Sequence, residues 1–440
     1  MESQQKIPDT DTPEEIKKST TTQNEENLKK RKRDENEKEE ERKNPIFTTG
    51  TSIFITPLNF IYPKPENILT IRQILYEDLK DIPNRPKTLQ GALLTTFALE
   101  MEFIMPIVTA GFKVCIVSHG KPERVEKISD NFTVVYPKVQ QWGSFHPKLF
   151  ILKFPYRLRI VITSANLVGC DWNLIGQCIW FQDFFYGDDP DAGFLKDLKK
   201  FVDDIIPKKT EILKELGIDL DRYNFRNSAV DLITSVPGKY RIPCDYGFEK
   251  INQFVKKKYS HFTYQCSSVG ALTGTLKKDI CKSFTNNPNC EIDIIFPCFR
   301  NVMESHLGTP GAGVFFMKEN SYKNEDFLHK NLCSMEGPTE SFSGHLSHSK
   351  VLIIHDNYEI NDETLIYIGS HNLSGAAWGK YEKNNTQLSI SNYEAGIIFK
   401  SQPDSKDLKK YIISQLPFKF PPSKYLRDDR PFFIDTDMGK

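Results

Sequence analysis

The sequence predicts an α/β protein built from two similar domains, related by a pseudo-twofold axis and preceded by a disordered tail. Short apolar runs alternate with helix-like segments, which is typical of α/β layers. One nine-residue pattern, S-x-N-L-x-G-x-x-W, occurs at 164–172 and again at 370–378, and each copy follows a His-x-Lys triplet. Such a long period indicates duplicated domains rather than a repeat array. A chain of 440 residues can form two domains with sizeable cores.

Six apolar runs have the length of buried strands. They are 113–119, 149–154, 159–164, 292–297, 350–355 and 365–370. A helix is expected over 194–206, because its apolar residues recur at the spacing of one helix face. These residues are Phe194, Leu198, Phe201, Val202 and Ile205. A second helix is expected from Thr210 to the glycine at 217, a residue suited to a helix C-terminus.

The first 45 residues are rich in charged and polar side chains, and the first aromatic residue is Phe47. Such a segment buries too little apolar surface to offset the entropy of ordering, so we expect 1–45 to be disordered. Its basic run at 29–33 is either a nuclear import signal or a solvated charge run. Turn residues at 235–243 predict the domain boundary, giving a first domain over 46–240 and a second over 241–440.

Composition excludes several classes of protein. The formal net charge is zero, so any site for a polyanion has to be a local groove. Nine cysteines without a C-x-x-C pair argue against a disulfide framework or zinc ribbon, and they favour a reducing compartment. The longest apolar stretch, 98–117, contains Glu100, Glu102 and Lys113, which a bilayer-spanning helix would not readily carry. We therefore expect a soluble protein without a membrane partner.

The doubled pattern places a histidine, a lysine and an asparagine on neighbouring strands. Residues i and i+2 of a strand project from the same face, and the next strand delivers the asparagine at its end. The two sets are His146, Lys148 and Asn166, and His348, Lys350 and Asn372. A third triplet, His119-Gly-Lys121, lacks the downstream pattern, and we expect it to be a loop. Packing under the site is expected for Leu167, Trp172, Leu373 and Trp378.

These residue types suit phosphate chemistry. Lysine supplies a compact cation and asparagine supplies neutral N–H donors, so neither a metal nor another cofactor is expected. Two histidines on opposite sides of one phosphorus would allow in-line displacement. One imidazole would attack while the other protonates the departing oxygen, and a water activated by the second would then cleave the phosphohistidine.

On these residues the chain resembles the phospholipase D superfamily and, within it, the tyrosyl-DNA phosphodiesterase family. The stretches QCSSVGALTG, FPCFRNV with GTPGAG, and SNYEAGIIF are similar to that family as well. A phospholipase D signature has Asp five residues after the triplet lysine, where this chain has Lys153 and His355. That departure favours the phosphodiesterase branch. The resemblance covers almost everything from Asn44 onward and implies two phospholipase D-like α/β/α domains.

The resemblance also implies a role for each site residue. His146 would be the nucleophile and His348 the proton donor and later acceptor, while the lysines and asparagines would hold phosphate oxygens. Gln177 and Glu394 match two further family positions, each expected against the histidine of the opposite half, so that Glu394 contacts His146. Trp142 would either stack on a DNA base or pack against the protein. The family contacts the DNA backbone where this chain has Ser267 and Ser268. No peptide-side contact could be assigned within 92–103.

The implied activity is metal-independent hydrolysis of the bond between a DNA 3′ phosphate and a tyrosyl peptide derived from topoisomerase I. This is a nuclease reaction in DNA repair, carried out by a nuclear, monomeric enzyme on single- and double-stranded 3′ ends. A phenolate with a pKa near 10 needs only modest protonation to depart. A lipid or general nuclease substrate is a second hypothesis, which the missing Asp argues against and a lipid turnover assay would decide. An inactive DNA-end-binding protein is a third, which the completeness of both motif sets argues against.

Overall fold

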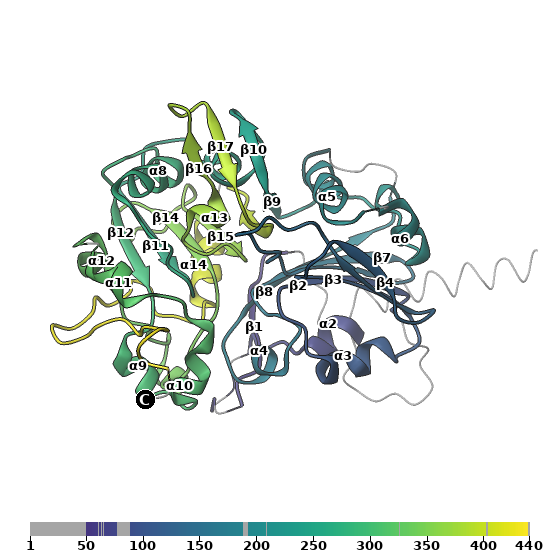
Figure 1. Cartoon of the computed structure of the whole chain (residues 1–440), viewed down its shortest axis with the longest axis horizontal. Coiled ribbons are helices and arrows are strands. Elements are labelled where there is room, and N and C mark those ends of the chain that lie inside the picture. Colours follow the sequence, from purple (N-terminus) through teal and green to yellow (C-terminus); the bar gives the residue numbers. More distant parts are fainter. Residues whose placement is uncertain are drawn as a thin grey trace, which may run out of the picture. The chain divides into compact units, whose positions relative to one another are not determined.

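Two β-sheets, one from each half of the chain, form the framework of the structure, a computed structural model (Figure 1). The structure describes residues 50–59, 61–62, 64, 66–76, 89–187, 192–207, 209–324, 326–401 and 404–438. The predicted disordered leader over 1–45 and its basic run at 29–33 lie outside the described residues. Within the described part of the chain, no helix combines the length and apolar character needed to cross a bilayer.

The first sheet has the strand order β1-β8-β7-β6-β2-β3-β5-β4 among the described residues. Its strands are β1 (Phe54–Ile55), β2 (Gly91–Thr96), β3 (Lys113–Ser118), β4 (Arg124–Lys127), β5 (Phe132–Tyr136), β6 (Leu149–Lys153), β7 (Arg157–Thr163) and β8 (Cys178–Phe185). Strands β2, β3 and β5 run parallel to one another, whereas β6, β7 and β8 alternate in direction.

The second sheet has the order β13-β12-β11-β14-β15-β18-β9. Its strands are β9 (Val230–Ser235), β11 (His261–Gln265), β12 (Glu291–Ile295), β13 (Leu332–Cys333), β14 (Val351–His355), β15 (Leu365–Gly369) and β18 (Glu394–Phe399). Neighbouring strands can be compared across the two sheets, from β9 to β13 in the second and from β1 to β5 in the first. Each pair of neighbours in the second sheet is parallel or antiparallel as the corresponding pair in the first sheet is. The repeated sequence pattern thus corresponds to a repeated topology, as predicted.

A small antiparallel sheet joins β10 (Gly238–Arg241), β17 (Gln387–Ile390) and β16 (Lys380–Glu382) beside the second sheet. Helices before this point are α2 (Ile71–Tyr76), α3 (Met101–Val108), α4 (Gly169–Asn173), α5 (Ala192–Ile205), α6 (Lys209–Glu215) and the 3₁₀ turn η1 (Leu220–Arg222). The second half contains α7 (Gly247–Asn252), α8 (Gly274–Thr285), α9 (Phe299–Met303), α10 (Gly308–Gly311), η2 (Ala312–Val314), α11 (Glu319–Lys323), α12 (Asp326–Asn331), η3 (Glu340–Phe342), α13 (Gly375–Trp378) and α14 (Lys406–Ser414).

Helices cover both faces of the first sheet. Adjacent residues of a strand point to opposite faces, so they pack against different helices. Leu94 belongs to the apolar cluster that includes residues of α2 and α3, whereas its neighbour Leu93 packs with the cluster that includes α5 and α6. The five predicted apolar residues of α5 are all buried. Gly217 follows α6 with a φ of +67°, which suits glycine at a helix end and confirms the predicted stop.

All six predicted strand segments overlap strands of the two sheets. The domain boundary proposed at 240/241 differs from the point where the chain changes sheets. That change lies between β8, which ends at Phe185, and β9, which begins at Val230 and pairs with β18 of the second sheet. The turn residues after β9 lead from the second sheet into β10 of the small sheet and do not mark the start of the second sheet. The division of the chain into domains over 46–240 and 241–440 therefore stays a proposal.

One apolar cluster contains residues of both sheets, so the halves share a core. Helix α5 packs against β9, and β7 lies against β15 and β18. Two isolated bridges link the halves beside the repeated triplets, one between Phe145 and Tyr393 and the other between Gly176 and Ser347. The packing of the halves therefore brings the two triplets toward one region.

Candidate active site

Each triplet leads directly into a central strand. His146 and Lys148 precede β6, and His348 and Lys350 precede β14. The asparagines, Asn166 and Asn372, follow the neighbouring strands β7 and β15. Both lysines are fully buried, and His348 is buried as well. Core strands made of apolar residues thus carry their polar side chains at the ends that meet between the halves.

Equivalent contacts orient the two lysines. Lys148 Nζ donates to the carbonyl oxygen of His146 at 2.7 Å, and Lys350 Nζ donates to that of His348 at 2.5 Å. Each ammonium therefore uses one of its three hydrogens within its own triplet. The remaining hydrogens are available to bind oxygens of a ligand.

The two asparagines are also held in equivalent ways. The Asn166 Oδ1 atom accepts from the backbone amides of Phe97 and Ala98, both at 3.3 Å. Backbone amides of Ser267 and Ser268 donate to Asn372 Oδ1 at 3.2 and 3.0 Å. Because a backbone N–H can only donate, each amide presents its oxygen to these groups and its Nδ2 atom on the other side. An Nδ2 atom has two hydrogens to donate, and that of Asn166 already donates one of them to Asp171.

The two histidines are paired across the halves. Glu394 Oε2 lies 2.8 Å from His146 Nδ1, and Gln177 Oε1 lies 3.3 Å from His348 Nδ1. This is the crossed arrangement expected from the sequence. Both acceptors require an N–H at Nδ1, so the neutral imidazoles carry their lone pairs at Nε2. The structure thus fixes the tautomers that nucleophilic and acid–base chemistry would use.

A serine supports each of these partners. Ser370 Oγ donates to Glu394 Oε2 at 2.5 Å, and Ser164 Oγ donates to Gln177 Oε1 at 2.7 Å. Both serines begin the repeated S-x-N pattern, so the repeat itself contains the signal for them. Neither serine was among the predicted site residues.

Main-chain bonds between the halves hold the histidines in place. The His146 amide donates to the Tyr393 carbonyl at 3.0 Å, and the His348 amide donates to the Gly176 carbonyl at 2.8 Å. Tyr393 and Gly176 are each one residue from the partner of the bonded histidine, which are Glu394 and Gln177. Each imidazole and its partner are thus positioned by the same strand end.

Burial is the main cause that lowers the pKa values of the bases in this site. Burial lowers the pKa of Lys148 to about 7, and it lowers that of Lys350 well below the ordinary value, with the charge of Lys148 as the next cause. Burial followed by the two lysine charges also lowers the pKa values of His146 and His348. His146 is therefore neutral at neutral pH, and its contact with Glu394 is a hydrogen bond from a neutral imidazole.

Asp171 is a buried carboxylate that the sequence analysis missed. Its Oδ2 atom accepts from the backbone amide of Asn166 at 2.7 Å and from Asn166 Nδ2 at 2.9 Å. Its charge also opposes the lowering of both lysine pKa values. The second copy has Ala377 at the equivalent position, so comparison of the two copies gave no signal for an acid there.

The remaining predicted residues differ in their surroundings. Trp142 is 86% exposed, which excludes the packing alternative in this structure. Ser267 is buried, and its Oγ atom also donates to Asn372 Oδ1 at 3.2 Å, whereas Ser268 is half-buried. The expected packing of the motif's leucines and tryptophans is confirmed, because all four are buried. The Phe97 ring lies 5.5 Å from the His146 ring and 4.9 Å from the His119 ring.

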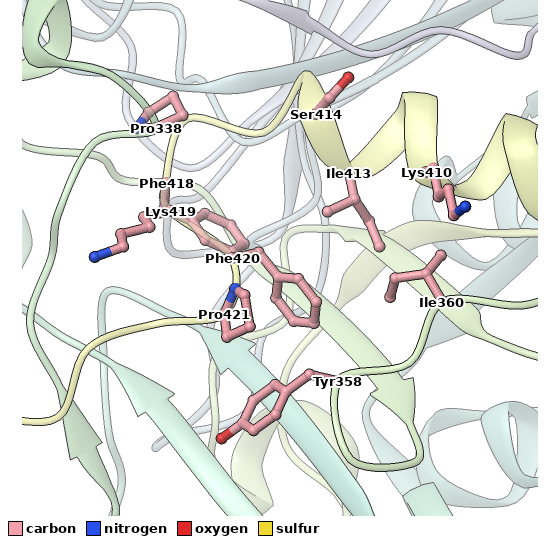
Figure 2. Close-up of a pocket in the computed structure, with 10 residues that line it drawn as sticks. All are labelled: Pro338, Tyr358, Ile360, Lys410, Ile413, Ser414, Phe418, Lys419, Phe420 and Pro421. Carbon is pink, nitrogen blue, oxygen red and sulfur yellow. The ribbon is translucent and has the colours of Figure 1, made fainter.

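A separate cleft lies at the far ends of the second-half strands. It has a volume of about 400 Å³, and its lining includes the rings of Tyr358 and Phe420 (Figure 2). His355, in the position of the phospholipase D aspartate, contacts both rings and accepts from or donates to Thr263 Oγ1 at 3.0 Å. None of the predicted site residues lines this cleft, so it contributes nothing to the assignment.

The fold and this site define a phosphodiesterase of the hydrolase class. The sequence model of the family described as tyrosyl-DNA phosphodiesterase matches residues 64–426. Because that match spans most of the sequence, the chain belongs to the tyrosyl-DNA phosphodiesterase family. The family predicted from the doubled motif is therefore confirmed.

Individual relatives agree with this assignment. Tyrosyl-DNA phosphodiesterase 1 of Arabidopsis thaliana is 24% identical over 428 residues, covering 80% of this chain and 70% of the relative. The Drosophila melanogaster protein of the same name is 25% identical over 421 residues, covering 84% of this chain and 71% of the relative. The crystal structure of the yeast tyrosyl-DNA phosphodiesterase has the same fold, with a TM-score of 0.69 at 18% identity over 87% of this chain and 99% of that one.

Binding of an anion at this site is expected to take up protons. An anion between the two lysine side chains raises their pKa values, so at pH 8 a lysine with a pKa of about 7 gains a proton on binding. Sulfate is suitable as the probe because it does not itself titrate there. Calorimetry at pH 8, in buffers with different ionisation enthalpies, should give uptake of roughly one proton per sulfate bound. Uptake should fall in Lys148→Met, and a zero or negative value for the wild type would contradict this account of the charges.

Proposed function

We propose that the chain hydrolyses the bond between a DNA 3′ phosphate and the tyrosyl oxygen of a topoisomerase I-derived peptide, through a phosphohistidine and without a metal. The crossed pairing of His146 with Glu394 and of His348 with Gln177 is the observation that carries this proposal. It gives one imidazole an anionic partner and the other a neutral partner. Two histidines with different tasks require such a difference.

In the first step, the lone pair of His146 Nε2 attacks phosphorus, and the bond from phosphorus to the tyrosyl oxygen breaks. The imidazole becomes cationic as the N–P bond forms. Glu394, which accepts the Nδ1 hydrogen, stabilises that developing charge without moving. His146 is neutral beforehand because its pKa lies below the ordinary value. The nucleophile is thus available without prior loss of a proton.

His348 supplies the proton that the departing tyrosyl oxygen takes up. This role requires the protonated imidazole, which burial and then the nearby lysine charges disfavour. A bound phosphodiester offsets those charges and raises the pKa of His348. Gln177 orients the ring but, being neutral, does not hold the proton too tightly. A phenol with a pKa near 10 then leaves with partial protonation.

In the second step, the now neutral His348 takes a proton from water, which attacks the same phosphorus. The N–P bond breaks, His146 leaves as a neutral imidazole, and the product is a 3′-phosphate end. Lys148, Lys350 and the Nδ2 atoms of the two asparagines would hold the non-bridging oxygens throughout. Four donors from two equivalent sets supply the stabilisation for which many phosphoryl-transfer enzymes use a metal ion.

The DNA end would approach from the side of Trp142, Ser267 and Ser268. An exposed tryptophan can stack on a base, and base–aromatic stacking contributes about 1–3 kcal/mol in single-strand binders. Stacking does not require a base-paired partner, so single- and double-stranded 3′ ends are both proposed as substrates. We further propose that the enzyme is a monomer and acts in DNA repair in the nucleus.

Replacing the nucleophile should abolish turnover. His146→Ala removes the atom that bonds to phosphorus, and neither Lys148 nor His348 can take its place. Cleavage of a 3′-phosphotyrosyl oligonucleotide, measured in EDTA, should fall to background, while Met101→Ala, an exposed change outside the site, keeps wild-type activity. Wild-type activity in His146→Ala would remove this residue as nucleophile, and loss of wild-type cleavage in EDTA would contradict the metal-free reaction.

Replacing the proton donor should trap the intermediate. In His348→Ala the phenolate can still leave slowly, but no base activates water, so the covalent adduct at His146 accumulates. Turnover should fall by about 10²- to 10⁴-fold, the usual contribution of acid–base catalysis. Denaturing gels and intact-mass measurement detect the adduct, which His146→Ala in the same background should eliminate. Unreacted substrate without adduct would contradict the assigned order of the two histidines.

A further inference from the structure

The third His-x-Lys triplet, His119-Gly-Lys121, has no part in the proposed chemistry but lies beside it. It follows β3 as a loop, in agreement with the sequence prediction. The strand order places β3 next to β2, whose end carries Phe97, and two strands from β6, which His146 precedes. The triplet therefore faces the segment that enters β6.

Both polar side chains of this triplet bind that segment. His119 Nδ1 accepts from the backbone amide of Phe145 at 3.1 Å. Lys121 Nζ donates to the carbonyl oxygen of Gln141 at 3.2 Å. Two contacts thus hold residues 141–145 at both ends. The exposed Trp142 lies between these ends, and His146 follows immediately.

The opposite half holds the same segment from its other side. Asn392 Oδ1 accepts from the Ser144 amide at 3.0 Å, and the Tyr393 amide donates to the Ser144 carbonyl at 2.9 Å. Gly143 lies so near the backbone of the opposite half that a Cβ atom at this position would be 2.0 Å from the Ser391 carbonyl oxygen. Because both halves bind residues 141–145, a small change in the contacts from either half would move this segment.

Aromatic packing connects His119 to the nucleophile. The Phe97 ring lies 4.9 Å from the His119 ring and meets the His146 ring edge-on at 5.5 Å. Phe97 also donates its backbone amide to Asn166. The ring of His119 therefore supports a side chain that contacts the nucleophile, in addition to the backbone just before it.

The contact with Phe145 requires an unprotonated Nδ1 atom, because a backbone N–H can only donate. Burial lowers the pKa of His119, and the charge of Lys121 lowers it further, so the imidazole is a neutral acceptor at neutral pH. Its hydrogen is then on Nε2. The contact needs only a neutral acceptor atom at the position of His119 Nδ1, and another side chain can supply one.

We propose that His119 and Lys121 form a clamp that positions the 141–146 segment, setting the approach of His146 to phosphorus and the placement of Trp142. Both are positioning residues and neither contacts the reacting atoms. The kinetic consequences rest on the proposed function, whereas the structural consequences do not. The clamp is specific to the first half, since it depends on a triplet that has no counterpart in the doubled motif.

The test compares His119→Ala with His119→Asn in the full chain. The Asn Oδ1 atom can reach the place of Nδ1 and accept from Phe145, but it cannot become cationic, whereas Ala has no acceptor. His329→Ala is the matched control, because His329 is an exposed histidine on α12 that stacks on Tyr322 instead. Folding of each variant is compared by thermal unfolding.

Two readouts do not depend on activity. Hydrogen exchange of the Phe145 amide should be slow in the wild type, fast in His119→Ala and slow again in His119→Asn. Acrylamide quenching reports on Trp142, the exposed one of the four tryptophans, the other three being at most 2% exposed. We expect its quenching to change in His119→Ala alone. Equal exchange in the wild type and His119→Ala would overturn the clamp.

Kinetics provide the third readout, on a 3′-phosphotyrosyl oligonucleotide. We expect kcat to fall about tenfold in His119→Ala with KM changed less than about threefold, and His119→Asn to restore most of kcat, consistent with loss and recovery of one hydrogen bond. Unchanged kcat in His119→Ala, or equal loss in both variants, would overturn the positioning role. A wild-type protein that does not cleave the substrate would instead refute the proposed function, leaving the exchange experiment as the test of the clamp.

Discussion

The site depends on burying two ammonium groups in the interior shared by the two halves. Moving a charge out of water is costly unless partners compensate it, and here Lys148 and Lys350 each bind one main-chain carbonyl. Asp171 and Glu394 offset part of the charge, but the pKa values of both lysines still lie below their ordinary range. The fold thus maintains two buried lysines whose charged forms are disfavoured by burial. A phosphodiester is the kind of group that would favour those charged forms, which ties the protonation of the site to its function.

The departures from symmetry occur where the proposed tasks of the halves differ. A carboxylate faces His146, whereas a carboxamide faces His348. Asp171 has no acidic counterpart in the second half, and the alanine between Ser164 and Asn166 is replaced there by His371. His371 is buried, bonds to Tyr367 and Ser235, and has its pKa lowered to about 4 by burial. It therefore serves as a neutral core residue rather than as a third base.

Much of the fold could be predicted from the sequence, because buried strands require apolar runs and duplication repeats them. The runs at 149–154 and 350–355 become equivalent strands, and the apolar face of α5 is buried as its spacing indicates. The sheet change before β9 could not be located, because β9 and β8 are both apolar strands and only pairing distinguishes their sheets. Turn residues at 235–243 indicate equally well a change of direction within one half, which here leads from β9 into β10 of the small sheet.

The histidines, lysines and asparagines of the site were predictable because they repeat, whereas Gln177 and Glu394 were predicted only from the family resemblance. Glu394 lies against His146 and Gln177 against His348. The backbone amides of Phe97 and Ala98 carry no side-chain signal, and Asp171 has no counterpart in the second copy. The His-x-Lys triplet at His119 indicated only a loop. Its contact with Phe145 could not be predicted, because it depends on the order of the strands in the sheet.

The proposed mechanism requires imidazoles from both halves to contact one phosphorus atom. An experimental structure with orthovanadate would show whether they do, because vanadate adopts the five-coordinate geometry of in-line displacement. We expect vanadium bonded to His146 Nε2, with His348 Nε2 hydrogen-bonded to the oxygen at the opposite apex. Vanadate bound to one histidine alone, with the other directed into a separate cavity, would contradict it.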